Sequence, residues 1–231
     1  MSYAESETAR IAAEYERRER EIPADFYSWS NPANLLIHQQ AVRSCVELLK
    51  RVAMFPLNGR RVADIGCGSG TWLLEFLQWG ADDVSGIDLM PARIERARAR
   101  LPHADIRQGS AAQLPWPDQS FDLVTQFMLF MNVFDPQLKR EIANEMLRVL
   151  KRRGVILWFD LRIDNPRNSN ARGIRAREIR GLFPGCDVQL KSAILAPPVA
   201  RLIARWAWPL GETLHALPFL RTHYVGVIRK P

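Results

Sequence analysis

Short apolar segments alternate with longer amphipathic segments between residues 61 and 160. The apolar segments have strand length and are bounded by glycine, proline and polar residues, which is typical of buried strands. In the amphipathic segments, apolar residues recur every three or four positions, as in helices that pack on a sheet. The pattern predicts strands at 61–65, 84–87, 104–108, 121–127 and 154–160, with helices at 71–79, 91–100 and 136–150. This alternation predicts an α/β fold, a Rossmann-like doubly wound sheet of mostly parallel strands that binds ligands at the carboxyl ends of those strands.

Further helices and strands flank this alternation. Residues 5–21 are rich in Ala, Glu and Arg, a composition that favours a helix. Prolines and aromatic residues at 22–34 predict a loop. The other expected elements are helices at 35–53 and 175–183 and strands at 187–195 and 222–229. With these, the predicted sheet has seven strands.

A turn with three glycines follows the first predicted strand, in the sequence Val62-Ala-Asp-Ile-Gly-Cys-Gly-Ser-Gly70. The glycines remove side chains where a ligand must lie against the backbone, and Asp88 at the end of the next strand can accept hydrogen bonds from a ribose diol. The turn lacks the x-x-Gly that packs the pyrophosphate-binding helix of dinucleotide sites. Asp64 would repel phosphates but suits a cationic sulfonium group. The pattern therefore favours S-adenosylmethionine over NAD.

From about residue 58 to residue 160, the chain resembles the class I S-adenosylmethionine-dependent methyltransferases, in particular the small-molecule methyltransferase-11-like group. The resemblance also rests on Leu114-Pro-Trp-Pro117, Ser120-Phe-Asp-Leu-Val124 and Gly109-Ser-Ala111. It implies that the glycine turn holds the methionine part of the cofactor, Asp88 the ribose and residues 109–111 the adenine. Ser110 replaces the usual acid and brings no charge to that contact. The implied cofactor-binding residues are Asp64, Gly66, Cys67, Gly68, Gly70, Asp88, Leu89, Ser110, Ala111 and Gln126.

The resemblance also implies how the chain is organised. We expect a single domain over residues 1–231, in which the last strand is antiparallel to the rest of the sheet. Its expected parts are an N-terminal helical cap (1–57), a cofactor-binding core (58–160) and a substrate-side half (161–231) with a helical insertion (196–221). The N-terminal helix and aromatic loop resemble the segment that closes over cofactor and acceptor in small-molecule methyltransferases.

The insertion at 196–221 is longer than a hairpin connection needs. An amphipathic helix kinked near Pro209 is predicted by the spacing of Val199, Leu202, Ile203, Trp206, Leu210, Leu214 and Leu217. Three interpretations of this apolar stripe are open. It packs as an extra helix pair against the domain, it forms a lid over an apolar acceptor, or it rests on a membrane. In the last case, the residues expected at the interface are Trp206, Trp208, Arg201 and Arg205.

Composition and cysteine spacing exclude several classes of protein. Hydrophobic residues make up 47% of the 231 residues, which is enough for one globular core. The three cysteines have neither metal-site nor disulfide spacing, so we expect no metal and a reducing compartment. We expect no signal peptide, because the first residues are charged and lack an apolar stretch, and no apolar run reaches the ~18 residues of a membrane span. We therefore expect a cytoplasmic protein, peripheral to the inner membrane face if residues 196–221 contact lipid. The segment from Phe159 to Pro184 resembles a bacterial subgroup of the family, which implies a bacterial source.

The net charge of +7 and the pI of about 9.8 have two open interpretations, an anionic partner or solubility alone. DNA and some protein-amide methyltransferases place an Asn/Asp-Pro-Pro-aromatic motif after the fourth strand. This chain has apolar residues there instead, which argues against a nucleic-acid acceptor. Methyl transfer is an in-line displacement, so positioning of the acceptor supplies much of the rate.

Candidate acceptor-site residues come from strand ends and loops. For substrate binding they are Tyr27, Phe127, Arg162 and Arg167, and for catalysis Asp160 and His223. The two arginines can clamp an anionic acceptor. Asp160 ends a buried strand, where a carboxylate acts as a base, anchors a substrate hydroxyl or forms a salt bridge. His223 is a second candidate base, because it lies near the insertion.

The sequence therefore predicts methyl transfer from S-adenosylmethionine to a small-molecule, glycan-precursor or lipid-like acceptor. Oxygen is the expected atom, because no acidic cage for an amine is evident. An RNA methyltransferase and a non-catalytic adenosylmethionine-binding module are the alternatives that remain.

Overall fold

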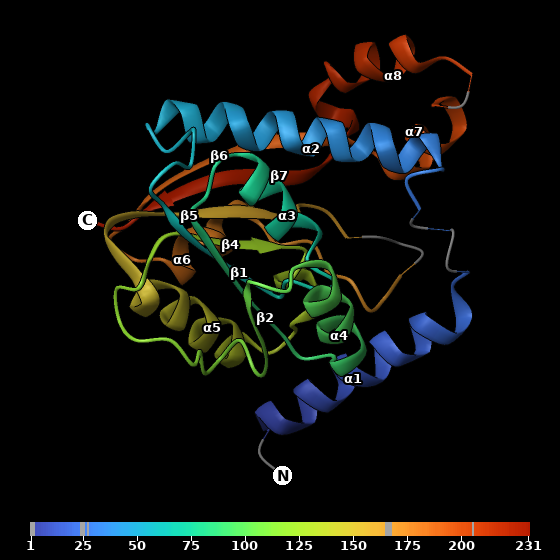
Figure 1. Ribbon diagram of the computed structural model, residues 1–231. Helices are drawn as coiled ribbons and strands as arrows, with labels where there is room; N and C mark the ends of the chain where they lie inside the picture. The colour runs from blue at the N-terminus through green and yellow to red at the C-terminus, as the bar shows by residue number, and fades with distance from the viewer. Residues whose placement is uncertain (1–2, 24–25, 27, 165–167, 205) are drawn as a thin grey trace.

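The computed structural model of the protein describes residues 3–23, 26, 28–164, 168–204 and 206–231. Its centre is a seven-stranded sheet with helices on both faces (Figure 1). The strand order is β3-β2-β1-β4-β5-β7-β6, and β7 is antiparallel to both of its neighbours, while the other pairs are parallel. The strands are β1 (Arg61–Ile65), β2 (Asp83–Asp88), β3 (Asp105–Gln108), β4 (Phe121–Phe127), β5 (Leu150–Leu161), β6 (Asp187–Leu195) and β7 (Arg221–Arg229). The predicted Rossmann-like sheet with an antiparallel last strand is confirmed.

The helices cover the two faces of the sheet in separate groups, and Figure 1 shows α2 and α5 on opposite sides of it. Leu48, Phe76 and Ile94, from α2, α3 and α4, belong to one buried cluster. Ile142 and Ile179, from α5 and α6, belong to a second cluster on the other face. The helices are α1 (Tyr3–Glu21), α2 (Pro32–Arg51), α3 (Thr71–Gln78), α4 (Pro91–Arg100), α5 (Pro136–Val149), α6 (Ala176–Leu182), α7 (Pro197–Ile203) and α8 (Trp208–His215), with short 3-10 helices η1 (Phe130–Asn132) and η2 (Pro218–Leu220).

Local sequence signals set where α2 and α5 begin. The side chain of Asn31 accepts a hydrogen bond from Ala33 N at 3.0 Å, and that of Asp135 accepts one from Gln137 N at 2.8 Å. A proline follows each cap, at a position where its missing N–H costs nothing. Because of this cap, α2 begins at Pro32, ahead of the predicted residue 35.

The insertion at 196–221 forms two helices instead of the one kinked helix predicted for it. The break between α7 and α8 precedes Pro209, which lies in the first turn of α8, where proline is tolerated. The prediction of one continuous, kinked helix is therefore wrong at this break, whereas two helices that each pack on the domain agree with the helix-pair interpretation.

The apolar residues of the insertion divide between an inner and an outer side. Val199, Ile203 and Leu214 pack in a cluster with α2, and so does Trp208, which was expected at a membrane interface. Exposed instead are Leu202, Trp206, Leu210 and Leu217. Arg205 lies outside the described residues. In the part of the chain that the structure describes, no helix has both the length and the hydropathy to cross a bilayer.

Gly226 tests how tightly β7 is inserted between β5 and β6. A Cβ at this position would lie 2.7 Å from Gln189 O and would overlap the side chain of Leu190. We expect Gly226→Ala to lower the free energy of unfolding by about 2 kcal/mol, measured by urea denaturation, because the backbone of β6 cannot move aside cheaply. Gly181→Ala is the control, since no atom lies within 4 Å of a Cβ there. Equal midpoints for Gly226→Ala and the wild type would contradict this packing.

Candidate active site

The turn after β1 brings backbone, not side chains, to the carboxyl edge of the sheet. Gly66, Gly68 and Gly70 have φ angles of +79°, +54° and +77°, a left-handed backbone that other residues adopt only with strain. The N–H of Gly66 donates to Ile87 O at 2.8 Å, which fixes the turn against β2. A Cβ on Gly66 would lie 3.2 Å from Leu129 Cδ1. Leu129 therefore packs closely on Gly66, where a larger residue would be too close to it.

Asp88 ends β2 beside this turn and is held by two backbone groups. Its Oδ2 accepts from Gly68 N at 2.9 Å, and its Oδ1 accepts from Met90 N at 2.9 Å. A carboxylate oxygen can accept two hydrogen bonds, so both oxygens keep acceptor capacity toward the cavity that Asp88 lines. This geometry is compatible with binding of a ribose diol, the role expected from the sequence.

The cavity extends from the glycine turn along the ends of β2, β3 and β4. Of the residues selected from the sequence, those that line it are Gly66, Asp88, Leu89, Ser110, Ala111 and Phe127. Gly68 and Gly70 belong to the adjoining turn. Tyr15 of α1, which belongs to the segment expected to close over the cofactor, and Met128 after β4 also line it. Further walls come from residues that the sequence analysis missed, among them Thr8 and Ile11 of α1, Arg93 of α4 and Leu129. The signal for α1 was the four-residue spacing of its apolar Ile11 and Tyr15 in an otherwise polar helix.

Three expected cofactor-binding residues lie beneath the cavity, away from its lining: Asp64, Cys67 and Gln126. The Thr125 hydroxyl donates to Asp64 Oδ1 at 2.6 Å, and burial raises the pKa of Asp64 to about 7. The Gln126 amide donates to one backbone carbonyl and accepts from one backbone N–H. Cys67 packs under the turn, where burial raises the pKa of its thiol. These side chains support the turn and the end of β4, and their direct contact with a ligand stays a prediction.

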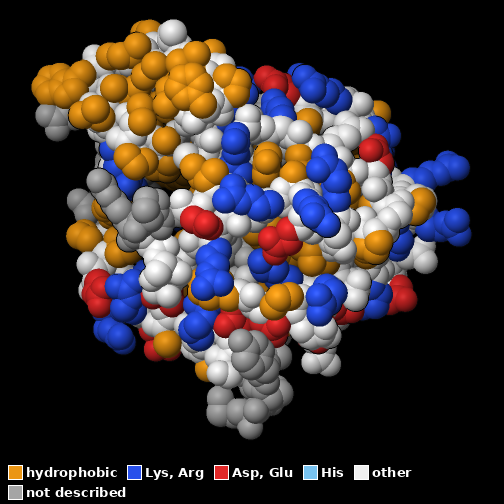
Figure 2. Space-filling view, turned by 180° about the vertical axis from the view of Figure 1, so that it is seen from behind, with side chains coloured by type: hydrophobic (Ala, Val, Ile, Leu, Met, Phe, Trp, Pro, Cys, Tyr) orange, Lys and Arg blue, Asp and Glu red, His pale blue; other side chains and the backbone are white. Residues whose placement is uncertain are grey.

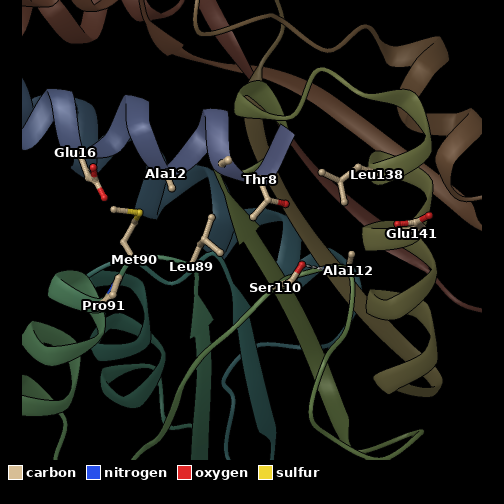
Figure 3. Close-up of a pocket in the computed structure, with 11 residues that line it drawn as sticks. Thr8, Ala12, Glu16, Leu89, Met90, Pro91, Ser110, Ala112, Leu138 and Glu141 are labelled. Carbon is tan, nitrogen blue, oxygen red and sulfur yellow. Dashed lines mark hydrogen bonds between the residues drawn. The ribbon is translucent and has the colours of Figure 1, made fainter. Parts of the chain in front are cut away.

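Helix α1 lies across the open side of the cavity. Figure 3 shows an adjoining groove in which Thr8, Ala12 and Glu16 of α1 face Leu89, Met90 and Pro91. The other side of the groove is formed by Ser110, Ala112, Leu138 and Glu141. Most of these side chains are small or apolar, so the groove suits a flat heteroaromatic ring.

The C-terminal half of α1 is attached to α4 and to η1. Glu19 forms ion pairs with Arg96 and, at 3.9 Å, with Arg93. The Arg93 guanidinium also lies 4.1 Å from the centre of the Tyr15 ring. The Tyr15 hydroxyl accepts from Asn132 Nδ2 at 3.0 Å. Burial raises the pKa of Tyr15, so its phenol is neutral and contributes a ring and a hydroxyl to the cavity wall.

The N-terminal half of α1 is attached to the residues around η1. Glu7 accepts from Phe134 N and Arg10 donates to Asn132 O, each at 2.5 Å. Arg10 also donates to Glu7 at 2.8 Å, and this hydrogen bond holds the pKa of the Glu7 carboxyl below its usual value. We call the contacts of Glu7, Arg10, Tyr15 and Glu19 the polar clasp. The clasp fixes α1 over the cavity from both ends.

Asp160 is fully buried at the end of β5 and accepts three backbone N–H groups. The donors are Phe130, Met131 and Leu161, at 2.9, 3.2 and 2.8 Å. Burial raises the pKa of Asp160 to about 7, although these hydrogen bonds act in the opposite direction. Its Oδ2 thus holds η1, which follows the cavity-lining Met128, while its Oδ1 binds Leu161 of its own strand and Asp160 itself does not line the cavity. Its role as a base stays a prediction.

Stacked rings form a row where β4 and β5 end and β7 begins. Ring centres are 3.8 Å apart for Trp72 and Phe127, 5.5 Å for Phe127 and Phe159, and 5.2 Å for Phe159 and His223. We call these four residues the aromatic row. His223 Nδ1 lies 3.0 Å from the Thr222 hydroxyl, and burial lowers the pKa of His223 to about 4, so the ring is neutral at pH 7. It lies behind Phe159, away from the cavity lining, and its role as a base also stays a prediction.

The structure does not gather the expected substrate-binding residues at one place. Phe127 lines the cavity, but Arg162 lies beyond β5, with its guanidinium 5.6 Å from the centre of the Tyr224 ring. Tyr27 and Arg167 lie outside the described residues. Substrate contacts by the two arginines and by Tyr27 therefore stay predictions.

The residues present fit S-adenosylmethionine. Gly66 lines the cavity with backbone alone, against which an amino-acid moiety can lie. Asp88 offers acceptors for ribose hydroxyls, and the groove beside Met90 and Ser110 has the composition of an adenine site. The three parts follow one another along the carboxyl ends of β1, β2 and β3.

Comparisons with known proteins agree with this fit. A methyltransferase-domain family profile matches residues 62–154. A probable S-adenosylmethionine-dependent methyltransferase of Mycolicibacterium smegmatis is 37% identical over 144 residues, 59% of this chain and 54% of its own. Phthiotriol/phenolphthiotriol dimycocerosates methyltransferase 1 of Mycobacterium ulcerans is 32% identical over 54% of this chain and 51% of its own. The 27-O-demethylrifamycin SV methyltransferase of Amycolatopsis mediterranei is 31% identical over 68% of this chain and 61% of its own.

The chain thus spans about half the length of each of the first two of these curated relatives. Among solved structures, an S-adenosylmethionine-dependent methyltransferase from Mesorhizobium loti shares the fold with a TM-score of 0.58, at 18% identity over 82% of this chain and 96% of that one. The glycine turn, Asp88 and the strand order agree with these relationships. The chain belongs to the class I S-adenosylmethionine-dependent methyltransferases, with S-adenosylmethionine as its cofactor.

Proposed function

We propose that this protein transfers the methyl group of S-adenosylmethionine to an oxygen atom of a lipid-like small molecule. The observation that carries the proposal is one cavity that joins the glycine turn and Asp88 to an apolar wall of Phe127, Met128 and Leu129. When bound, the cofactor supplies an electrophilic methyl group on a positively charged sulfur. The wall beside the turn then forms the surface against which an acceptor lies.

The charge of the cavity lining supports oxygen as the acceptor atom. Among the described residues, Asp88 is the one carboxylate in the lining, and it already binds the backbone of the turn. A cationic amine would enter without a second counter-charge, which makes its desolvation costly. A neutral hydroxyl pays a much smaller desolvation cost in the same space.

The apolar character of the wall supports a lipid-like acceptor. The aromatic row places large rings behind Phe127, so this wall is rigid as well as apolar. Two relatives have names that point the same way. One is named for dimycocerosates, which are lipids, and another for 27-O-demethylrifamycin SV, in which the methyl-accepting atom is an oxygen.

In this proposal, the protein contributes mainly by positioning. An in-line displacement needs the acceptor held on the side of the methyl group opposite to sulfur. Asp160 acts as a positioning residue, because its Oδ2 accepts two hydrogen bonds from η1 and so holds the neighbouring wall at Met128 and Leu129. Tyr15 forms part of the cavity wall on the side of α1.

Methyl-labelled S-adenosylmethionine tests the acceptor class. The purified protein is incubated with the label and a bacterial extract, and the organic, aqueous and macromolecular fractions are counted. We expect label in the organic fraction, since the cavity wall is apolar. Label confined to RNA would contradict the acceptor class, and no label in any fraction would contradict catalysis.

Asp88→Ala tests the cofactor site. We expect the affinity for S-adenosylhomocysteine, measured by calorimetry, to fall between about tenfold and a hundredfold, the cost of losing hydrogen bonds to a charged acceptor. Asp83→Ala is the matched control, because Asp83 begins the same strand and is half-exposed in an ion pair with Arg61. Unchanged affinity in Asp88→Ala would show that the ribose lies elsewhere.

A further inference from the structure

An exposed apolar surface covers the outer side of the α7–α8–η2 segment. Figure 2 shows it as a continuous group of hydrophobic side chains at the upper left. We call this group the apolar face, and it consists of Leu202, Trp206, Leu210, Leu217 and Phe219. Leu202, Trp206 and Phe219 are 75%, 77% and 76% exposed. Scattered exposed hydrophobic residues are ordinary, but a contiguous group marks a contact surface.

The helices that carry the apolar face are anchored to the domain. Ala200 and Ala204 are buried in a cluster with Leu36 of α2 and Leu195 of β6. Gly211 brings α8 close to α2, since a Cβ there would lie 2.7 Å from Leu36 Cδ2. The apolar face is therefore held in place by a packed inner side.

The apolar face lies at the same edge of the sheet as the cavity. Strand β6 runs parallel to β5, because both are antiparallel to β7. Its carboxyl end at Leu195 therefore shares an edge with Asp88 and Phe127, and α7 begins directly after it. Figure 1 shows α7 at the upper right of the molecule and α1 along its lower edge. Among the described residues, however, none from α7 or α8 lines the cavity, so the segment is not a lid in this structure.

Positive charge adjoins the apolar face at Arg201 of α7, the neighbour of Leu202. Residues 188–211 contain no acidic residue, and Lys191 in this stretch is ion-paired with Glu47 at 2.6 Å. The first acid after them, Glu212, forms an ion pair with Arg43 at 2.7 Å. The Arg201 guanidinium lies 4.5 Å from the centre of the Phe26 ring, and Arg201 is exposed. Leucine and aromatic side chains flanked by arginine match the interface of an anionic bilayer, where apolar groups enter the acyl boundary and cations meet phosphates.

We propose that the apolar face docks the protein on an anionic lipid bilayer. The docked orientation brings the cavity edge to the membrane, from which the acceptor enters. The inference rests on the proposed function only for this last step, because docking itself requires neither cofactor nor acceptor. It selects the membrane interpretation of the insertion over the lid and over simple packing.

Vesicle cosedimentation of the full chain tests the proposal. The probes are vesicles of one part phosphatidylglycerol to two parts phosphatidylcholine, and vesicles of phosphatidylcholine alone. We expect binding to the anionic vesicles, and at least about tenfold weaker binding for Leu202→Glu/Phe219→Glu, since two apolar side chains no longer enter the interface. Leu77→Glu is the control, because Leu77 is an exposed leucine near the end of α3, away from the apolar face.

Two results would overturn the proposal. One is equal vesicle binding by the wild type and Leu202→Glu/Phe219→Glu. The other is a wild-type dimer, detected by light scattering without lipid, that the same double variant converts to a monomer, because the apolar face would then be an interface between two copies. A separate measurement, calorimetry with S-adenosylhomocysteine, distinguishes failure of docking from failure of the proposed function. If the double variant binds S-adenosylhomocysteine with normal affinity, its docking defect leaves the cofactor site intact. If the wild type docks on vesicles but does not bind S-adenosylhomocysteine, the proposed function alone is contradicted.

Discussion

The two hydrogen bonds that Asp88 accepts hold the site together. Through Gly68 N they fix the turn after β1, and through Met90 N they fix the start of α4. One carboxylate therefore connects three elements at the carboxyl edge of the sheet, and hydrogen bonds to a charged acceptor are stronger than neutral ones. The direction of α4 in turn places Arg93 and Arg96 where they meet Glu19 of α1. The position of α1 over the cavity thus depends on the turn and on the start of α4, both of which Asp88 holds.

The two walls of the cavity differ in what stabilises them. One wall, made by the glycine turn and the strand ends, belongs to a sheet whose central strands are buried between two helical layers. Helix α1 is held largely by the polar clasp, whose ion pairs involve partly exposed side chains. Such pairs contribute at most about 1 kcal/mol each. Because the clasp is polar and only Glu7 among its four residues is buried, α1 is the cavity wall that separates from the domain at the lowest cost. A ligand can therefore enter beneath α1 without disturbing the sheet.

Most of the sheet, and part of the site, could be predicted from the sequence. The periods of strands and helices are local properties of the sequence. The glycine turn and Asp88 are close in the sequence, and they meet in the structure as their spacing predicts. The resemblance implied that the N-terminal helix closes over the cofactor, but it did not identify Thr8, which reaches the cavity through tertiary contacts. The backbone partners of Asp160 could not be predicted either, since its three N–H donors come from η1 and from β5. The spacing of Leu202, Leu210 and Leu217 placed them on one side, as the structure has them, but did not locate the break between α7 and α8.

Hydrogen exchange of the full protein with and without S-adenosylhomocysteine tests most directly whether the cofactor lies between the glycine turn and α1. The account predicts slower exchange at residues 66–70, at residues 88–91 and along α1 when the ligand is bound. It predicts no change in α6 and β6, which lie away from the cavity. Slower exchange at the turn with α1 unaffected would contradict the claim that α1 forms the second wall of the cofactor site.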